Sequence, residues 1–385
     1  MTKAWGALDG SALFGPVPNP HRHDHSRLLK PFDVPPERGR VDAVIVPSRR
    51  PPTMLRTAAR VARKLDVPLV VLTSKSWSEE EAHEVLDGRP GAVVPLGARV
   101  RRPFFRLSVA QLSDTRRNPH ADTAAKRNVG LRLARRLGWR RVLFLDDDVV
   151  DLPRSQVLAA AGAMEGAGLR AVGWALADFP DNSVICHLRR EVRLEQGIFI
   201  GGGALLVDTL GEVPFFPPVY NEDWLFLHDP VREGRVTMAG EVGQEAFNPF
   251  KVRRARREEF GDILAEGLFG LIHAERPVEE ALSADLWHEV LRGRAVMLQE
   301  VRERMTLLFA GPGVPARRRR TFERCWQASV EECTSFAPSL FTAYVRAWRD
   351  DQDRWVEQLA ELEGTGDDLG TALKFENLTG AHVSG

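Results

Sequence analysis

The sequence predicts an α/β fold, with a mostly parallel central sheet flanked by helices and a helical C-terminal extension. Three observations lead to this prediction. Short β-rich apolar runs alternate with segments of helical spacing over residues 41–275. The first run is followed by a helical segment and a second run, as in a βαβ unit. Over residues 276–385 the apolar residues recur at helical spacing, which predicts a helical region.

The first forty residues precede this pattern. They are rich in Pro, His and Arg and have no clear period, which predicts a loosely structured extension, residues 1–40, laid on the surface. His21, His23 and His25 form a cluster that can bind a metal ion, but no Cys or carboxylate framework surrounds it. A solvated polar tail is therefore the favoured interpretation.

The α/β domain opens with the βαβ unit. Residues 42–47 and 68–74 are short β-branched runs typical of buried strands, and residues 53–65 between them have helical spacing. Two strands joined in this way are expected to be parallel, with a right-handed crossover.

The same alternation continues along the chain. Residues 123–138 predict a helix that leads into a buried strand at residues 140–145. Residues 169–176 and 201–207 predict two further strands. Together these elements indicate one wound α/β domain.

The C-terminal region carries three segments of helical spacing, at residues 283–310, 320–336 and 339–363. Four tryptophans are expected to anchor their packing, because aromatic residues at helical spacing are usually core residues. They are Trp287, Trp326, Trp348 and Trp355. The tail beyond residue 370 is expected to be frayed.

The bulk composition excludes some classes of function. Lys plus Arg and Asp plus Glu are both 53, so the formal net charge is +0, which argues against a general nucleic-acid binder and a polybasic membrane-surface protein. No segment has the apolar length of a signal peptide or a membrane span. Three scattered cysteines, Cys186, Cys325 and Cys333, fit a reducing compartment. We expect a cytoplasmic protein.

Three consecutive carboxylates follow the buried strand at residues 140–145. Asp146, Asp147 and Asp148 repel one another and gain nothing from burial, so a compensating charge is expected. If the extended chain continues, Asp146 and Asp148 point to one side and Asp147 to the other. Two carboxylates on one side suit a hard divalent cation, and ligands of parallel α/β sheets bind beyond the carboxyl ends of the strands.

Five segments occur in a characteristic order, at residues 44–50, 122–130, 146–148, 201–207 and 221–226. This ordered set resembles the nucleotide-sugar glycosyltransferases of the GT-A fold, in particular the large family 2-type group. The resemblance covers the α/β domain and implies a Rossmann-like GT-A fold. It also implies a hexosyltransferase that moves a sugar from a nucleotide-diphosphate donor to an acceptor hydroxyl.

The resemblance implies roles for individual residues. The donor-binding positions are Pro47, Ser48, Arg49, Asp122, Lys126, Arg127, Asn128, Asp147, Gly202 and Gly203. Cations near a diphosphate strengthen binding, and an Arg fork matches phosphate oxygens. A run of glycines lets the backbone approach a ligand closely, although it can also mark a bend that enters a strand.

In inverting members of the group, an acidic residue in the segment at 221–226 is the general base for the acceptor hydroxyl. The resemblance assigns this role to Asp223, with Glu222 as the rival. Their aromatic neighbours can raise the basicity of a carboxylate. The same two residues also suit the first turn of a helix.

The expected cofactor is Mg²⁺ or Mn²⁺, held by Asp146 and Asp148. His273 is a third candidate ligand, because some retaining enzymes resembling glucosyl-3-phosphoglycerate synthase have a His at a similar position. Retaining and inverting outcomes both stay open, with inverting slightly favoured. The expected partners are the donor and an unidentified acceptor, and the C-terminal helices are a candidate surface for a homo-oligomer.

Two other classes of protein fit parts of the sequence. In a haloacid-dehalogenase-like phosphatase, Asp146 is the nucleophile, Asp148 the general acid and Mg²⁺ the cofactor, and Lys251 with a later Gly-Asp step completes the pattern. This class leaves the segments at residues 44–50 and 221–226 without a role. The other class is a non-catalytic nucleotide-sugar-binding protein.

Overall fold

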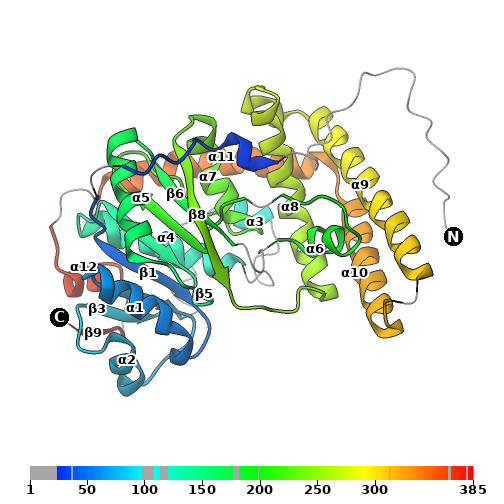
Figure 1. Cartoon of the computed structure of the whole chain (residues 1–385). Helices are drawn as coiled ribbons and strands as arrows, with labels where there is room; N and C mark the ends of the chain where they lie inside the picture. Colours follow the sequence, from blue (N-terminus) through cyan, green and yellow to red (C-terminus); the bar gives the residue numbers. More distant parts are fainter. Residues whose placement is uncertain are drawn as a thin grey trace.

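A computed structural model describes residues 24–35, 38–97, 108–112, 120–176, 182–197, 199–311, 313–362, 366–378 and 380–384. The central feature is a nine-stranded sheet with helices on both faces, and a group of long helices extends from one side of it (Figure 1). The predicted α/β fold with a mostly parallel sheet flanked by helices is confirmed.

The order of strands in the sheet is β5-β8-β6-β7-β4-β1-β2-β3-β9. Parallel pairing joins β1 to β2, β1 to β4, β2 to β3 and β6 to β8, whereas β7 runs antiparallel between β4 and β6. The strand bounds are β1 Ala43–Ser48, β2 Leu69–Thr73, β3 Gly91–Pro95, β4 Arg141–Leu145, β5 Val149–Val150, β6 Ala171–Leu176, β7 Ala204–Asp208, β8 Val236–Gln244 and β9 His382–Ser384. The predicted strands correspond to β1, β2, β4, β6 and β7.

Strict alternation along the strands makes two cores. In β1, Ala43 and Ile45 face one core, and Val44 and Val46 face the other. The second core also contains side chains of α1 (Arg56–Leu65), α2 (Glu79–Leu86) and α5 (Arg154–Ala167). The first core contains α4 (His120–Arg136), α6 (Val184–Glu191) and α7 (Glu222–Arg232).

The first core continues into the C-terminal helices. These are α8 (Val252–His273), α9 (Ala284–Ala310), α10 (Ala316–Ser335), α11 (Pro338–Ala360) and α12 (Leu369–Phe375). Short helical segments are α3 (Val109–Leu112), η2 (His25–Leu28), η3 (Pro52–Leu55) and η4 (Val278–Leu282). Helices α9, α10 and α11 confirm the three predicted C-terminal segments. The domain boundary at residue 275 stays a prediction.

The tryptophans pack as predicted, but the prediction for the C-terminal end of the chain is wrong. Trp287, Trp348 and Trp355 are at most 1% exposed, and Trp326 is partly buried. The expected frayed tail is wrong, because α12 packs on α4 and β9 pairs antiparallel with β3 at the edge of the sheet (Figure 1). A strand therefore follows the helical region.

The described part of the N-terminal segment packs on the rest of the chain. Lys30 forms a bridge to Thr237 of β8, and His25 is only 5% exposed. The solvated-tail interpretation is therefore wrong for His25, and His21 and His23 lie outside the described residues. His25 contacts Glu266 of α8.

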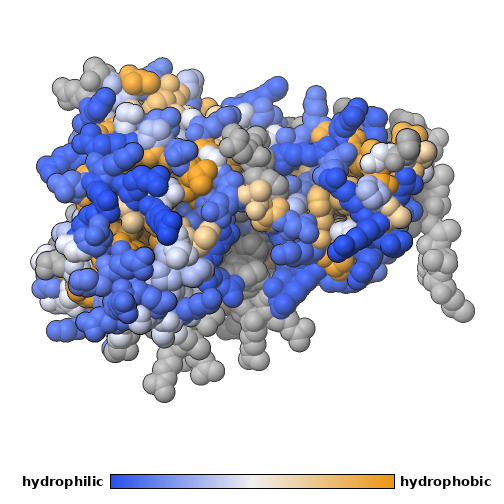
Figure 2. Space-filling view, turned by 60° about the horizontal axis from the view of Figure 1, so that its bottom comes forward, coloured by the Kyte–Doolittle hydropathy of each residue, from blue (hydrophilic) through white to orange (hydrophobic). Residues whose placement is uncertain are grey.

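The surface carries few large apolar side chains. On the face drawn in Figure 2, hydrophilic side chains predominate and hydrophobic ones lie in small separate groups. Among the described helices, none combines the length and apolar content needed to cross a membrane. Cys186, Cys325 and Cys333 are buried and form no disulfide.

Candidate active site

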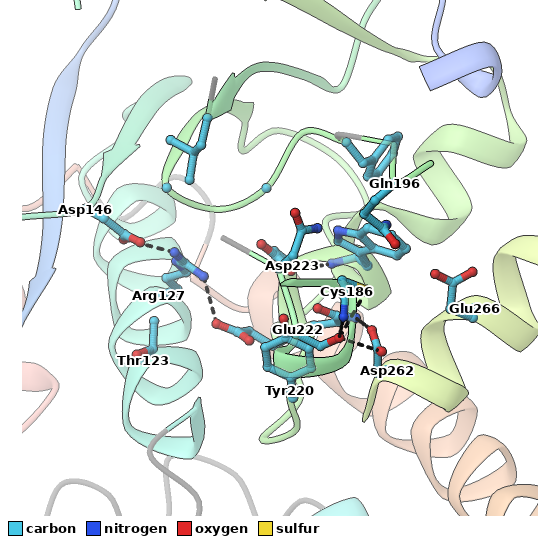
Figure 3. Close-up of a pocket in the computed structure, with 18 residues that line it drawn as sticks. Thr123, Arg127, Asp146, Cys186, Gln196, Tyr220, Glu222, Asp223, Asp262 and Glu266 are labelled. Atoms are coloured by element: carbon cyan, nitrogen blue, oxygen red, sulfur yellow. Dashed lines mark hydrogen bonds and ion pairs between the residues drawn. The ribbon is translucent and has the colours of Figure 1, made fainter. Parts of the chain in front are cut away.

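A cavity of about 210 Å³ lies at the carboxyl ends of β4 and β6 (Figure 3). Its walls come from segments far apart in the sequence, namely α4, the turn after β4, the glycines before β7, the start of α7, and α8. Five predicted site residues line it, and these are Arg127, Asp146, Gly203, Glu222 and Asp223. Four of the five segments of the sequence pattern thus meet at one place, and the segment at residues 44–50 does not line the cavity.

Arg127 connects two of these walls. Its Nη2 donates to Asp146 Oδ1 at 3.0 Å, and its Nη1 donates to Glu222 Oε1 at 2.9 Å (Figure 3). The side chain is 3% exposed, and the neighbouring carboxylates raise the pKa of the guanidinium despite its burial. Arg127 therefore remains a cation in the cavity wall.

The two acids at the start of α7 have different environments. Glu222 is 5% exposed and paired with Arg127, and burial raises its pKa well above the usual value. Asp223 is partly exposed to the cavity, and its Oδ2 accepts the backbone N–H of Gly202 at 2.7 Å. Asp223 is thus fixed in position with access to a ligand, whereas Glu222 is held against Arg127.

The glycine run permits this close packing. A Cβ at Gly201 would lie 2.8 Å from Asp223 Oδ2, and a Cβ at Gly202 would lie 2.3 Å from Arg127 Cζ. A side chain at either position would push against the groups that form the cavity. The glycines therefore let the backbone approach these polar side chains.

Lys126 is not among the residues that line the cavity. It is 1% exposed, and its ammonium donates to Ser48 O at 2.7 Å, Ser74 Oγ at 2.6 Å and Asp122 Oδ2 at 2.7 Å. These three bonds use all its donors. Burial alone raises the pKa of Asp122, but the charge of Lys126 outweighs it and the pKa lies below the usual value. Lys126 and Asp122 are not among the residues that line the cavity, and the pair joins α4 to the ends of β1 and β2. Their donor contacts stay a prediction.

Asn128 also has a structural role. Its amide donates to Phe216 O and accepts from Phe216 N, both at 2.8 Å, and it is 4% exposed. Both ends of the amide are used by the backbone, and the donor contact of Asn128 stays a prediction.

The end of β1 lies outside the cavity. Pro47 and Ser48 are buried, and Ser48 Oγ donates to Asp147 Oδ2 at 2.6 Å. Arg49 is 58% exposed and its Nε is 3.7 Å from Asp122 Oδ2. Of these residues, Arg49 has the most freedom to reach a phosphate group.

The three aspartates separate. Asp146 pairs with Arg127, whereas Asp148 Oδ2 accepts from Arg50 Nη2 at 2.7 Å. Asp147 lies with Asp148, since Arg50 Nε is 3.3 Å from its Oδ1. The expectation that Asp146 and Asp148 point together is therefore wrong. The strand ends at Leu145, so the alternation of an extended chain stops before the triplet.

His273 lies with a different group again. Its Nε2 is 3.0 Å from His25 Nδ1, and His25 Nε2 is 3.2 Å from Glu266 Oε2. Among the described residues, no three His, Cys, Asp or Glu side chains are arranged to hold a metal ion. The predicted ligand set of Asp146, Asp148 and His273 thus does not fit a Mg²⁺ or Mn²⁺ ion as the side chains lie.

Sequence reasoning missed the part of the site on α8. Asp262 and Glu266 line the cavity, and with Glu258 they recur every four residues on one helical face. That spacing is visible in the sequence and was a usable signal. Asp262 accepts from Arg294 of α9 at 2.7 Å, which connects the C-terminal helices to the cavity wall. Arg50, next to the predicted Arg49, was also missed.

A second cavity of about 480 Å³ adjoins the first. The lining residues that the two share are Asn182, Gln196, Phe199, Trp224 and Glu266. The rings of Phe199 and Trp224 are 5.1 Å apart, and both contact the ring of His25. The two cavities form one groove in two parts, with polar walls and the rings of Phe199 and Trp224 between the parts.

No known family model matches the chain, and no curated protein is similar to it at a significant level. Solved structures with distant similarity include the following two. A mannosyltransferase from Pyrobaculum calidifontis in complex with GDP-Man and Mn²⁺ has 14% identity and a TM-score of 0.41, over 85% of this chain and 92% of that chain. Core-mannan synthase A from Aspergillus fumigatus, in its Mn/GDP form, has 11% identity and a TM-score of 0.25, over 58% and 71%. Both TM-scores are below 0.5, so these similarities assign neither fold family nor function.

Proposed function

We propose that the chain is a glycosyltransferase of GT-A type that uses a nucleotide-diphosphate sugar, with an inverting mechanism and Asp223 as general base. One observation carries the proposal: Arg127, Asp146, the glycine run and Asp223 line or border one cavity at the carboxyl ends of sheet strands. This is where open α/β sheets bind their ligands. These residues belong to four of the five segments of the sequence pattern.

The reaction needs three events. The acceptor O–H gives its proton to Asp223 Oδ1 or Oδ2 as its oxygen forms a bond to the anomeric carbon. The bond from that carbon to the diphosphate breaks, and its electron pair leaves with the phosphate oxygen. The N–H of Gly202 fixes the carboxylate of Asp223, and a positioned base of this kind contributes roughly 10²–10⁴-fold to a rate.

The lining supports a sugar as the group transferred. Asp146, Glu222, Asp223, Asp262 and Glu266 offer carboxylate oxygens that accept from hydroxyls, and Trp224 offers an aromatic face. The exposed Arg49 supports a diphosphate outside this acidic cavity, since a guanidinium suits phosphate oxygens. The adjoining cavity is the proposed acceptor site. We also propose a cytoplasmic location.

The phosphatase alternative has little support. Lys251 is exposed at the start of α8 and is not among the residues that line the cavity with Asp146. Asp146 is paired with Arg127, which lowers its availability as a nucleophile. Phosphate release from sugar phosphates without any nucleotide would reverse this preference.

The test combines binding and turnover. We expect one of UDP-, GDP-, dTDP- or ADP-sugars, screened with and without Mn²⁺, to raise the melting temperature. With that donor, Asp223→Asn should lower nucleoside diphosphate release about 10²–10⁴-fold and keep the donor-induced shift, because Asn retains the acceptor oxygen for Gly202.

Asp285→Asn is the matched control, since Asp285 is an exposed acid in the first turn of another helix. It should leave release unchanged. If no nucleotide sugar shifts the melting temperature, or if Asp223→Asn turns over like the unsubstituted protein, the proposal is wrong.

A further inference from the structure

The carboxylate of Asp262, on α8, joins three other segments of the chain (Figure 3). Its Oδ1 accepts from Asn221 Nδ2 at 3.3 Å, and its Oδ2 accepts from Ser183 Oγ at 2.8 Å and from Arg294 Nη2 at 2.7 Å. Asn221 is the N-cap of α7 and Ser183 is the N-cap of α6, whereas Arg294 belongs to α9. One side chain thus holds the starts of two helices to the C-terminal region.

The N-cap of α7 is unusual in two ways. Asn221 has a φ of 62° and a ψ of 36°, in the left-handed region that residues other than glycine rarely adopt. Asn is a favoured N-cap because its side-chain oxygen accepts an N–H of the first turn, but Asn221 makes no such bond. Its amide donates to Asp262 instead. Such strain persists where surrounding contacts impose it, and it often accompanies a functional site.

Helix α8 fits closely against the turn that leads into α7. A Cβ at Gly261 would lie 2.2 Å from Tyr220 O, so only glycine permits this approach of the two backbones. Gly261 directly precedes Asp262, and Tyr220 directly precedes Asn221. The close approach therefore brings the carboxylate of Asp262 to the side chain of Asn221.

Arg294 supplies the positive charge beside Asp262. Its Nε and Nη2 also donate to Glu259 of α8, at 2.6 and 3.0 Å, and Arg294 is only 1% exposed. Burial alone lowers the pKa of Arg294, but its two carboxylate neighbours outweigh burial and raise the pKa. Arg294 is not among the residues that line either cavity. It therefore affects the site only through Asp262.

We propose that Arg294 is a positioning residue: through Asp262 and Asn221 it fixes the first turn of α7, and thereby the carboxylate of Asp223. Asp223 lies two residues after Asn221, and its Oδ2 accepts from Gly202 N at 2.7 Å. A helix of the C-terminal region thus sets the position of a cavity carboxylate. The inference rests on the proposed function only where Asp223 is treated as the general base.

The test follows hydrogen exchange of the Gly202 amide, which donates to Asp223, in protein labelled with nitrogen-15 at glycine. Arg294→Met should speed this exchange at least about tenfold, through a local opening whose rate does not depend on dilute urea. Asn221→Gly should do the same, because glycine keeps the left-handed backbone and lacks the amide. Gly130, buried inside α4, is the reference amide, because its exchange requires wider unfolding and rises with urea.

Two further variants complete the set. Arg292→Met is the matched control, because Arg292 is an exposed arginine two residues away on α9, and it should change neither amide. If Arg294→Met does not fold, Glu259→Gln is added to it, which removes a buried acid together with the cation, and Gly202 should again exchange faster. The proposal is overturned if Gly202 exchanges at the unsubstituted rate in Asn221→Gly and in the Arg294 variant, or if it only follows the urea dependence of Gly130.

The exchange measurement uses no nucleotide sugar. Local opening at Gly202 without any response to nucleotide sugars would support the positioning role and reject the transferase. With an identified donor, Arg294→Met should lower kcat about tenfold and leave the donor KM unchanged, since a positioned base acts in the transition state. Turnover that is lost in Asp223→Asn but unchanged in Arg294→Met would keep the transferase and overturn the positioning role.

Discussion

Three consecutive residues of α4 divide between the framework and the cavity. Lys126 and Asn128 are buried with their polar atoms used by other parts of the chain. Arg127, between them, lines the cavity with Asp146 and Glu222. Successive residues of a helix point about 100° apart, so Lys126, Arg127 and Asn128 point in three different directions.

Helix α7 shows the same division along its length. Glu222 and Asp223 in its first turn line the cavity. Asp229, two turns later, bonds to His228 at 2.9 Å and to Arg349 of α11 at 3.0 Å. The same residue type thus serves the cavity at one end of the helix and the packing of the C-terminal helices at the other. What distinguishes the two roles is that the first pair of acids lines the cavity whereas Asp229 contacts another helix.

The largest effect is expected where a framework residue is removed. Lys126→Met leaves Asp122 buried without its cation, and breaking a buried pair in this way costs roughly 3–5 kcal/mol. Chemical denaturation should show this loss in the free energy of unfolding. Lys64→Met is the control, because Lys64 is exposed on α1 and should stay within about 0.5 kcal/mol.

A different result would break the comparison. If Lys126→Met unfolds like the unsubstituted chain but no longer responds to nucleotide sugars, Lys126 belongs to the donor site. Its three hydrogen bonds within the chain would then have to be exchanged for contacts with the ligand.

Local patterns predicted the elements well. The apolar runs at β1, β2 and β4 alternate between two cores, and such period-two burial is readable from the sequence. The strand predictions depended on this local periodicity. That Arg127, Asp146 and Asp223 belong to one site was implied by the resemblance to the GT-A glycosyltransferases, and the three residues do line one cavity.

The choice of partners could not be predicted in the same way. Arg50 and Asp148 are 98 residues apart, and His25 and Glu266 are 241 apart, so their pairing depends on the tertiary fold. The prediction that Asp146 and Asp148 point together failed for a local reason, because the extended chain ends at Leu145.

A second prediction tests the contact between backbone and cavity. Gly202→Ala places a Cβ 2.3 Å from Arg127 Cζ, and Arg127 is fixed by Asp146 and Glu222. Overpacking of this kind costs about 1–3 kcal/mol, and nucleoside diphosphate release should fall as well. Denaturation and the turnover assay measure the two effects.

Gly166→Ala is the matched control, since a Cβ there meets nothing within 4 Å and the site is in α5. It should be neutral or stabilise by up to about 1 kcal/mol. If Gly202→Ala is as stable and as active as the unsubstituted chain, Arg127 can shift freely and does not define the cavity wall.

The smallest effect concerns the framework end of α7. Burial by itself raises the pKa of Asp229, but the hydrogen bond from His228 and the charge of Arg349 outweigh it and lower the pKa to about 2. The folded pKa thus lies below the unfolded one, so the stabilisation is complete above about pH 4 and is lost as pH falls through about 2. Asp229→Asn should cost at most about 2 kcal/mol at pH 7.

The pH dependence separates this role from simple loss of packing. Denaturation at pH 7 and near pH 2.5 should show the difference between Asp229→Asn and the unsubstituted chain shrinking in acid. Asp353→Asn, an exposed acid on the same α11 that supplies Arg349, should show little effect at either pH. A difference that stays constant with pH would mean that the charge of Asp229 does not hold α7 to α11, and the division of α7 into a cavity end and a framework end would lose its electrostatic basis.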